Sequence, residues 1–424
     1  MLRIRTWLPS QSLPFSCRLR VRTTGPPDRT GGRDTLLPVC PVPRRGGGAA
    51  GRATPLEPHV FVSSLTLSDF RNYAHLSIEL PPEGALFQGP NGSGKTNLLE
   101  AVHLLCVGRS QRSGPRAQMI RHSAPAASVR ATFQAGIDTG RTDAHIGFDR
   151  AGTVRMTRDG RVVATRREWF GGATVVALGP EDLRLVDGGP GERRRFLDML
   201  LSQVDGDYLS ALLQYNRALA NRNRVLADQG ADRLCDVYEE TMVRHGRYLY
   251  ERRARIVDLC QDWFARYYAE ISDAAEAASL QFRPSISPSD TGFSEWENVF
   301  YKALKNNRKQ DRELGYSRRG PHRDDLLISL DKRPARTYAS QGQLRSLALA
   351  LRLCAVRCIE QFRAETMVVL VDDAFSELDD RRIARVYPLI RQRGQVLMAT
   401  PVDRIPLQID LRRFAVSNGA VKVL

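Results

Sequence analysis

A glycine-rich loop early in the chain constrains its fold more than any other feature. Residues 89–96 read GPNGSGKT and match the spacing GxxxxGK[ST], in which backbone N–H groups surround the phosphates of a nucleotide. Lys95 is the only lysine in the first 301 residues, although the chain has 63 Lys and Arg residues. A compact ammonium suits terminal phosphates better than the planar guanidinium of arginine, and the Thr96 hydroxyl can reach Mg²⁺. The sequence therefore predicts a site for a nucleoside triphosphate and Mg²⁺.

The residues around this loop have the pattern that the motif requires. A short apolar run at 85–88 leads into it, and residues 97–107 have the apolar spacing of a helix. A strand, a glycine loop and a helix in this order place phosphates at the helix N-terminus. The residues expected to contact the nucleotide are Gly89, Pro90, Asn91, Gly92, Ser93, Gly94, Lys95, Thr96 and Asn97.

Composition predicts a globular protein with more than one packed unit. The chain has 424 residues, of which 42% are apolar and 26% charged, and no apolar run approaches the roughly 20 residues of a membrane span. A net charge of +16 favours a phosphate-rich partner. The seven cysteines include no CxxC pair, and Cys354 and Cys358 are expected on one buried helix face. This cysteine pattern suits a reducing cytosol, so a cytoplasmic protein is expected.

Residues 1–59 differ in composition from the rest. They contain ten Arg against three acidic residues, many Pro and Gly, and no apolar period. We expect a disordered extension or a start site placed too far upstream. A basic tail that grips DNA and a transit peptide are the alternatives.

The remaining sequence predicts an α/β core interrupted by a helical region. Further strands are expected at 60–68 and 75–80, and short alternating segments at 127–163 indicate an antiparallel lobe. Residues 192–271 indicate two or three helices with breaks near 205–206 and 230, followed by a helix at 295–311. Apolar strands alternating with helices in the last hundred residues favour a mixed or parallel sheet. These expected elements are strands at 175–178, 325–330, 367–371 and 395–400, and helices at 341–362 and 381–391.

Two acidic residues end the apolar strand at 367–371. Such a strand can hold one carboxylate beside the Mg²⁺ that Thr96 reaches, and a second near the terminal phosphate. We assign Asp372 to the metal and Asp373 to orienting or deprotonating the attacking water. Paired acids that only cap a strand are the alternative.

A further segment, SQGQ at 340–343, begins the helix expected at 341–362. Ser340 is a good N-cap, and Gly342 lets the phosphate of another chain approach the exposed N–H groups. Ser340, Gly342 and Gln343 are therefore candidate nucleotide contacts.

In this order the segments resemble ABC-type ATPases, in which the signature loop of one subunit completes the nucleotide site of another. Within that class, the chain resembles the RecF family of bacterial recombination and gap-repair proteins from about residue 60 to its C-terminus. The segments that carry the resemblance are FRNY at 70–73, GPNGSGKTN at 89–97, GPED at 179–182, RRRFLD at 193–198, GPHRDD at 320–325, YASQGQ at 338–343, DD at 372–373 and SELD at 376–379.

The resemblance implies an α/β fold: an ABC-type (P-loop) ATPase head with an antiparallel β lobe and an inserted helical arm. The expected parts are the extension at 1–59, the first half of the ATPase lobe at 60–190, the arm at 191–312 and the second half of the lobe at 313–424. It also implies an ATP-driven homodimer that clamps DNA, with weak, DNA-stimulated ATP hydrolysis as a release switch. Recombinational repair, replication restart and the SOS response are the implied processes, with RecR and RecO as implied partners.

Two positions depart from the pattern of ABC-type ATPases, and the glutamine loop has two candidates. Many have Glu where Asp373 stands, and the shorter acid fits slow turnover. Many have His after the strand that here ends at Thr400. Gln111 and Gln118 are the candidates for the glutamine loop.

Arginine clusters are the candidate DNA contacts, because arginine binds phosphates without regard to sequence. No aromatic ladder for single strands is visible, so duplex DNA or a single/double-strand junction is expected. The alternative is that the clustered arginines only face solvent on helix surfaces. His322 and Arg323 are expected in an intramolecular charge network with Asp324 and Asp325. The candidates are Arg193, Arg194, Arg195, Arg222 and Arg224, with Arg217, Arg318 and Arg319 nearby.

Two functions from different classes remain open on the sequence. One is an ATP-dependent DNA-binding switch. The other is a phosphate-loop kinase, or an SMC-like ATPase outside gap repair. The kinase would have no use for the segment at 340–343.

Overall fold

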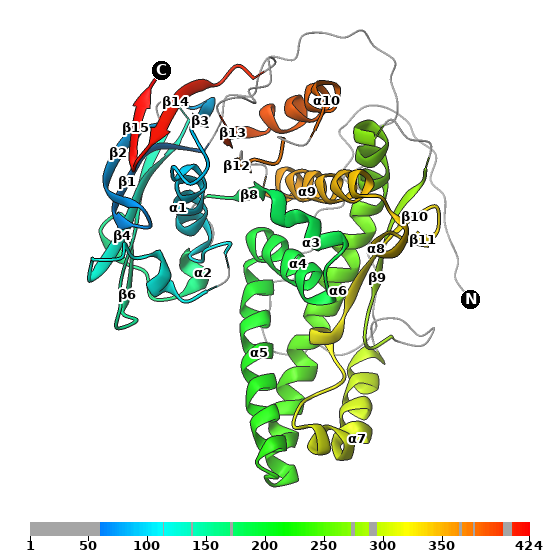
Figure 1. Cartoon of the computed structure of the whole chain (residues 1–424). Coiled ribbons are helices and arrows are strands. Elements are labelled where there is room, and N and C mark those ends of the chain that lie inside the picture. Colours follow the sequence, from blue (N-terminus) through cyan, green and yellow to red (C-terminus); the bar gives the residue numbers. More distant parts are fainter. Residues whose placement is uncertain are drawn as a thin grey trace, which may run out of the picture. The chain divides into compact units, whose positions relative to one another are not determined.

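Two sheets enclose the helix that follows the glycine loop (Figure 1). The structure is a computed structural model that describes residues 60–112, 114–136, 139–169, 173–272, 276–287, 295–363, 367–375, 378–401 and 409–424. The predictions for the extension at 1–59 and for Ser376 and Glu377 lie outside the described residues.

The first sheet is mostly parallel and contains strands from both the N-terminal and the C-terminal parts of the described chain. Its order is β15-β14-β3-β13-β12-β8, and only the β14–β15 pair is antiparallel. Every residue of β3 and β13 is buried, as the continuous apolar runs predicted. The strands are β3 (Gly84–Gln88), β8 (Val175–Leu178), β12 (Met367–Asp372), β13 (Gly394–Thr400), β14 (Arg412–Ser417) and β15 (Ala420–Val423).

The second sheet is antiparallel and forms the predicted β lobe. Its order is β2-β1-β4-β5-β6-β7. The first hairpin turns at Arg71 and Asn72 alone, because the pairing of Phe70 with Tyr73 extends the expected strands to the turn. A short helix, α2 (Arg166–Trp169), follows this sheet. The strands are β1 (Phe61–Phe70), β2 (Tyr73–Glu79), β4 (Ala126–Ala135), β5 (Thr139–Asp149), β6 (Val154–Arg158) and β7 (Arg161–Val162).

Helix α1 (Lys95–Val107) packs between the two sheets. It contacts β12 and β13 on one side and β4 and β5 on the other, and nearly all of its residues are buried. One hydrophobic cluster joins the helix to both sheets. A helix buried all round is held in place by packing, so the phosphate loop that precedes it has a fixed base.

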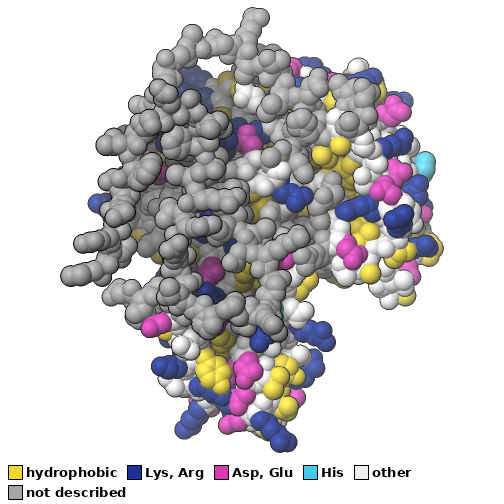
Figure 2. Space-filling model, turned by 180° about the vertical axis from the view of Figure 1, so that it is seen from behind, with side chains coloured by type: hydrophobic (Ala, Val, Ile, Leu, Met, Phe, Trp, Pro, Cys, Tyr) yellow, Lys and Arg dark blue, Asp and Glu magenta, His cyan; other side chains and the backbone are white. Residues whose placement is uncertain are grey.

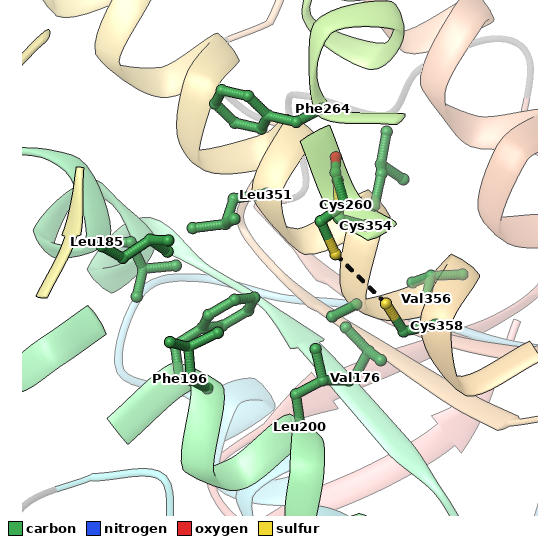
Figure 3. Packing of buried hydrophobic residues seen from close by; sticks show 14 of the residues in the cluster. Val176, Leu185, Phe196, Leu200, Cys260, Phe264, Leu351, Cys354, Val356 and Cys358 are labelled. Carbon is green, nitrogen blue, oxygen red and sulfur yellow. Dashed lines mark hydrogen bonds between the residues drawn. The ribbon is translucent and has the colours of Figure 1, made fainter. Parts of the chain in front are cut away.

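The opposite face of the parallel sheet is covered by helices that continue into the helical part. In Figure 3, Phe196 and Leu200 lie near Leu351 and Val176. The Sγ atoms of Cys260 and Cys358 lie 3.4 Å apart where α6 meets α9, within the hydrophobic core (Figure 3). The covering helices are α3 (Leu183–Val186), α4 (Pro190–Val204), α9 (Gln341–Arg363) and α10 (Asp380–Arg391).

The helical part consists of α5 (Gly206–Ala227), α6 (Asp232–Ser272) and α7 (Trp296–Leu314), which run side by side in Figure 1. The predicted break at 205–206 has a local cause, because Asp205 Oδ1 accepts hydrogen bonds from the N–H groups of Asp207 and Tyr208. Helix α6 has 41 residues and also packs on α9.

A small third sheet, together with a short helix, joins the arm to the signature segment. It has the order β11-β10-β9. Sequence reasoning found β10 but missed β9, which has the same length of six residues, and the single-turn helix α8. The elements are β9 (Ala278–Arg283), β10 (Asp325–Leu330), β11 (Arg333–Pro334) and the helix α8 (Ala335–Tyr338).

The start of β3 gives a stability prediction. Gly84 has φ +116°, and a Cβ there would lie 1.9 Å from the carbonyl oxygen of Val396 in β13. Gly152 also has a positive φ, +93°, but a Cβ there would meet nothing within 4 Å. We expect Gly152→Ala to lower the free energy of unfolding by about 1 kcal/mol, and Gly84→Ala by roughly 3 kcal/mol or more, because steric overlap adds to the strain. Urea denaturation of both variants measures the difference, and equal losses would contradict the close approach of β3 to β13.

Candidate nucleotide-binding site

The glycine loop connects β3 to α1, and its lysine lies folded over it. Lys95 Nζ donates hydrogen bonds to the carbonyl oxygens of Gly89 (2.7 Å) and Pro90 (2.9 Å). The side chain is buried, and this burial lowers the pKa of Lys95, while Asp373 and Asp372 act in the opposite direction. The ammonium therefore lies among carbonyl oxygens of its own loop, from which phosphate oxygens can attract it.

The β1–β2 turn supports the loop from outside. Asn72 Nδ2 donates to Ser93 O at 3.0 Å, and the hydroxyl of the fully buried Tyr73 donates to Gly94 O at 3.1 Å. Gly94 has φ +113°, and a Cβ there would lie 2.5 Å from Asn72 Nδ2. Only glycine fits this position, so the FRNY segment and the glycine loop depend on each other sterically.

Glu100 is a buried acid that sequence reasoning missed. Its side chain is fully buried on α1, where it pairs with Arg71 at 2.7 Å and accepts a hydrogen bond from Ser110 at 2.6 Å. Arg112 lies 3.6 Å from its other oxygen. A buried carboxylate is tolerated when it is paired and hydrogen-bonded in this way. Glu100 thus ties the β1–β2 turn and the segment at 110–112 to the helix behind the phosphates.

The acid predicted for the metal, Asp372, and the acid predicted for the attacking water, Asp373, lie at the end of β12. Asp372 Oδ1 accepts a hydrogen bond of 2.9 Å from Thr96 Oγ1. Burial raises the pKa of Asp372, and the Thr96 hydroxyl opposes that shift. Asp373 has φ +53°, a left-handed conformation that is uncommon outside glycine, and its N–H donates to Ala399 O at 3.0 Å. Non-glycine residues in this region gather at functional sites.

The Thr96 and Asp372 oxygens fit a magnesium ion. A hydroxyl and a carboxylate oxygen 2.9 Å apart beside a phosphate loop are the hard ligands that Mg²⁺ takes, and it completes its shell with phosphates and water. No group of three or more His, Cys, Asp or Glu side chains suited to a metal occurs in the described part of the chain. The site therefore offers too few protein ligands for a metal without the nucleotide.

A cavity of about 340 Å³ opens beside these acids, and its walls include Thr96, Gln111, Arg112, Asp372 and Asp373. Gln111 therefore reaches the nucleotide site. Gln118 does not line this cavity.

The signature segment forms the N-terminus of α9 and is exposed. The N–H of Ser340 donates to Gln343 Oε1 at 2.7 Å, and the N–H of Gln343 donates to Ser340 Oγ at 3.3 Å. This reciprocal pair is a capping box, which fixes the helix start. Gly342 has open space where a Cβ would be. Gln343 Nε2 donates to Glu276 at 2.9 Å, and none of the hydrogen bonds of residues 340–343 in the described structure goes to the glycine loop.

Two of the predicted DNA contacts are structural. Arg222 is fully buried and pairs with Glu239 at 3.0 Å and with Asp311 at 2.9 Å, which joins α5, α6 and α7. Arg193 is 6% exposed and pairs with Asp325 at 2.8 Å. We correct the prediction for both, because neither guanidinium reaches the surface where a DNA phosphate lies.

The neighbours of these two differ in exposure. Arg194 is half-buried and donates to Asp324 O at 2.7 Å, and burial lowers its pKa. Arg195 is half-buried and donates to Gln111 O at 3.1 Å. Arg224 is exposed. Sequence alone does not separate these cases, because all five arginines occur on helices of similar composition.

The GPHRDD segment forms an intramolecular network with other partners than expected. Its two acids pair with Arg253 of α6 and Arg193 of α4, whereas His322 and Arg323 contact the carbonyl oxygen of Ser317. Asp324 pairs with the buried Arg253 at 3.0 Å, and burial raises the pKa of Asp324 to about 6. His322 Nδ1 lies 2.6 Å from the Tyr215 hydroxyl, and burial lowers the pKa of His322 to about 4.

Within the described part of the chain, no helix has the length and apolar character needed to cross a bilayer.

Comparison with known proteins gives one consistent family. A family model described as "RecF/RecN/SMC N terminal domain" matches residues 61–405. Two relatives named "DNA replication and repair protein RecF" come from Halalkalibacterium halodurans, 31% identical over 370 residues, and Streptomyces avermitilis, 34% identical over 376 residues. Each alignment covers 85% of this chain and 99% of the relative.

Solved structures agree with these relatives. The "recombination mediator protein RecF-ATP in RecFOR pathway" matches with a TM-score of 0.79 at 26% identity, over 88% of this chain and all of that one. The Smc head domain from Pyrococcus furiosus has a TM-score of 0.51 at 19% identity, over 86% of this chain and 96% of that one, and shares the fold.

The two enclosing sheets, the glycine loop and these matches together define an ABC-type ATPase head, as predicted. The likeness goes further than the class, because the family model spans most of the chain and two relatives exceed 30% identity over nearly their whole length. The chain belongs to the RecF family.

The buried arginine of the arm gives a prediction of its own. Truncating one partner of a buried ion pair leaves the other charge without compensation. We expect Arg222→Ala to lower the free energy of unfolding by about 3–5 kcal/mol, whereas Arg224→Ala, two residues further along α5 and exposed, changes it by less than about 0.5 kcal/mol. Chemical denaturation of the two variants checks this, and similar values would show that Arg222 is not held in the network.

Proposed function

We propose that this chain is an ATP-dependent DNA-binding protein that acts in recombinational DNA repair, replication restart and the SOS response. The observation that carries the proposal is the separation of the two halves of the nucleotide site within one chain. Lys95, Thr96 and Asp372 lie together at the glycine loop. Ser340 and Gly342 lie exposed at the start of another helix, where Ser340 and Gln343 bond to each other and Gln343 bonds to Glu276. Relatives with the RecF name and a RecF-ATP structure support both the process and the nucleotide.

A second copy of the chain supplies the missing half. Ser340 and the N–H groups at the start of α9 form an anion site, since a helix N-terminus carries partial positive charge. Placed over the terminal phosphate held by Lys95 of the other subunit, this segment closes a symmetric dimer with two nucleotides. ATP therefore acts as the link between subunits, and loss of the terminal phosphate opens the dimer.

Hydrolysis is slow and serves as the release step. Thr96 and Asp372 hold Mg²⁺, which neutralises phosphate charge. Asp373 orients the attacking water, and its carboxylate is one methylene shorter than that of Glu. Gln111, at the wall of the cavity, is the candidate glutamine that contacts the metal or the water. A kinase would use the loop but has no role for the capped and exposed segment at 340–343.

DNA is held by arginines of the arm. Arg217 and Arg224 are exposed on α5 two turns apart and so lie on one face. The N–H of Ser317 donates to Asn223 Oδ1 at 2.9 Å, which brings Arg318 and Arg319 next to that helix. We take this arginine group (Arg217, Arg224, Arg318 and Arg319) as the duplex contact, in place of Arg193 and Arg222.

Other parts of the arm are less suited to a polyanion. Figure 2 shows the molecule from behind. Basic and acidic side chains are interspersed on the lower part of this view, where the arm helices lie in Figure 1. On α6 and α7, for example, Arg308 is paired with Asp236 and Glu239. Paired arginines of this kind are already neutralised.

RecR and RecO are proposed as protein partners and the cytoplasm as the location.

The trans arrangement is tested with two variants of the nucleotide site. We expect Lys95→Met to weaken ATP binding and dimerisation together, because the ammonium contacts the terminal phosphates. Ser340→Arg abolishes ATP-dependent dimerisation while the monomer still binds ATP, because Ser340 acts on the partner's nucleotide. Sedimentation velocity with Mg²⁺ and ATP measures dimerisation, and calorimetry on the monomer measures ATP binding, so the two variants can be told apart. A Ser340→Arg variant that dimerises like the wild type would exclude the trans site.

The arginine group gives a prediction in salt dependence. The logarithm of the DNA-binding constant falls linearly with the logarithm of the salt concentration, and removing two phosphate contacts makes this slope shallower by about two. We expect this for the double variant Arg217→Ala and Arg224→Ala, measured by fluorescence anisotropy on gapped duplex with ATP. The double variant Arg130→Ala and Arg161→Ala, exposed arginines of the antiparallel sheet, serves as the matched control and keeps the slope. Unchanged binding by the α5 variant would move the DNA site away from the arm.

A further inference from the structure

The segment before the signature is basic and exposed. From residue 332 to residue 339 the chain has three basic residues and no Asp or Glu. Arg333 and Arg336 are both exposed. Because this stretch contains no acid of its own, an anion from outside it is the expected counterpart. On the proposed function, that anion is the triphosphate of a second subunit.

An aromatic side chain lies in the middle of this charge. Tyr338 is 64% exposed, more than any other aromatic residue in the described part of the chain. The guanidinium of Arg333 lies 5.8 Å from its ring centroid, within the range of a cation–π contact. Exposing a ring of this size has a cost, which is removed when a flat partner covers it. Tyr338 stands two residues before Ser340.

The glycine loop has no such ring on its own side. The aromatic residues adjacent to it in the described structure are Phe70, Tyr73 and Phe87, and all three are at most 1% exposed. The Tyr73 hydroxyl is moreover bound to Gly94 O. These residues form the base of the loop and cannot stack on a nucleobase. A nucleotide in this loop therefore finds no aromatic surface among them.

We propose that Tyr338 of one subunit stacks on the purine base of the ATP held by Lys95 of the other subunit, with Arg333 on the ring of Tyr338. This inference rests on the proposed ATP-dependent dimer. Ser340 meets the terminal phosphate, and two extended residues span at most about 7 Å, so Tyr338 lies further along the nucleotide, towards the sugar and base. Base–aromatic stacking is strong enough to matter for affinity. The dimer is then selective for a nucleoside triphosphate over a bare triphosphate.

The first experiment compares nucleotides and variants in the full chain with Mg²⁺. Mass photometry gives the ATP concentration at half-maximal dimer. We expect Tyr338→Ala to raise it about tenfold, equivalent to about 1.4 kcal/mol, and Tyr338→Phe to leave it within about twofold, because the phenyl ring still stacks. Inorganic tripolyphosphate should support the wild type and Tyr338→Ala equally poorly. ATP binding to the monomer, measured by calorimetry on dilute protein, stays unchanged in Tyr338→Ala.

The chain offers a matched control for the removal of an exposed tyrosine. Tyr316 is 41% exposed and has the guanidinium of Arg323 5.1 Å from its ring centroid, but it lies in the arm. Tyr316→Ala should leave the ATP concentration for dimerisation unchanged. An equal effect of both variants would attribute the loss to general destabilisation and overturn the proposal.

Mixed dimers show whether the ring acts across the interface. A mixture of Lys95→Met and Tyr338→Ala chains can form one complete site, with Lys95 from one subunit and Tyr338 from the other. In a mixture of wild type with a chain carrying both substitutions, the heterodimer cannot form one, although the heterodimers of the two mixtures contain the same side chains. We expect the first mixture to form heterodimers at the lower ATP concentration.

The outcomes distinguish failure of the Tyr338 stacking from failure of the proposed ATP-dependent dimer. A wild-type chain that stays monomeric with ATP removes the proposed dimer and the stacking together. A wild type that dimerises, with Tyr338→Ala dimerising at the same ATP concentration, removes the stacking alone. Heterodimers that form at the lower ATP concentration in the second mixture would place the ring on its own subunit's nucleotide, and identical behaviour of the two mixtures would place it on no nucleotide.

Discussion

The parallel register of β3, β13 and β12 is the constraint on which the nucleotide site depends. β13 pairs with β3 on one side and with β12 on the other, so the C-terminal ends of all three strands lie at one sheet edge. Thr96 and Asp372 are 276 residues apart in sequence, yet their oxygens are 2.9 Å apart. A shift of one residue would turn Asp372 to the opposite face of the sheet. Packing of α1 against both sheets therefore positions the glycine loop and the acid relative to each other.

Short sequence motifs predicted the parts of the site that are formed by residues close together in the sequence. The glycine loop, the acids after an apolar strand and the capped signature each have a spacing that their chemistry requires, and the structure forms the corresponding elements. Glu100 and the roles of Arg193 and Arg222 were not predictable. The acids paired with Arg222 come from α6 and from α7, 17 and 89 residues away. Burial of a charge is decided by such distant partners, and composition carries no signal for them.

Arginine bias has a structural meaning as well as an electrostatic one. Arg222 and Arg253 each contact several partners at once from a fully or almost fully buried position, which the planar fork of five donors allows. A lysine offers a single point charge and would leave some of these acids unpaired. The high positive charge of the chain therefore overstates its free basic surface, since part of the arginine is neutralised inside the arm. This is why exposure, and not clustering in the sequence, selects the DNA candidates.

The three consecutive arginines of α4 connect the nucleotide site to the arm. Arg195 donates to Gln111 O at the wall of the cavity, whereas Arg194 and Arg193 bind Asp324 and Asp325 at the start of β10. Asp324 in turn pairs with Arg253 of α6, whose far end packs on α9 behind the signature. The links as far as Arg253 are direct hydrogen bonds or ion pairs, and the last one is the packing of α6 on α9. A shift of the Gln111 backbone would therefore be transmitted to α4 through Arg195. Helix α4 is bonded in turn to the residues that contact the arm, and α6 of the arm packs on the signature helix α9.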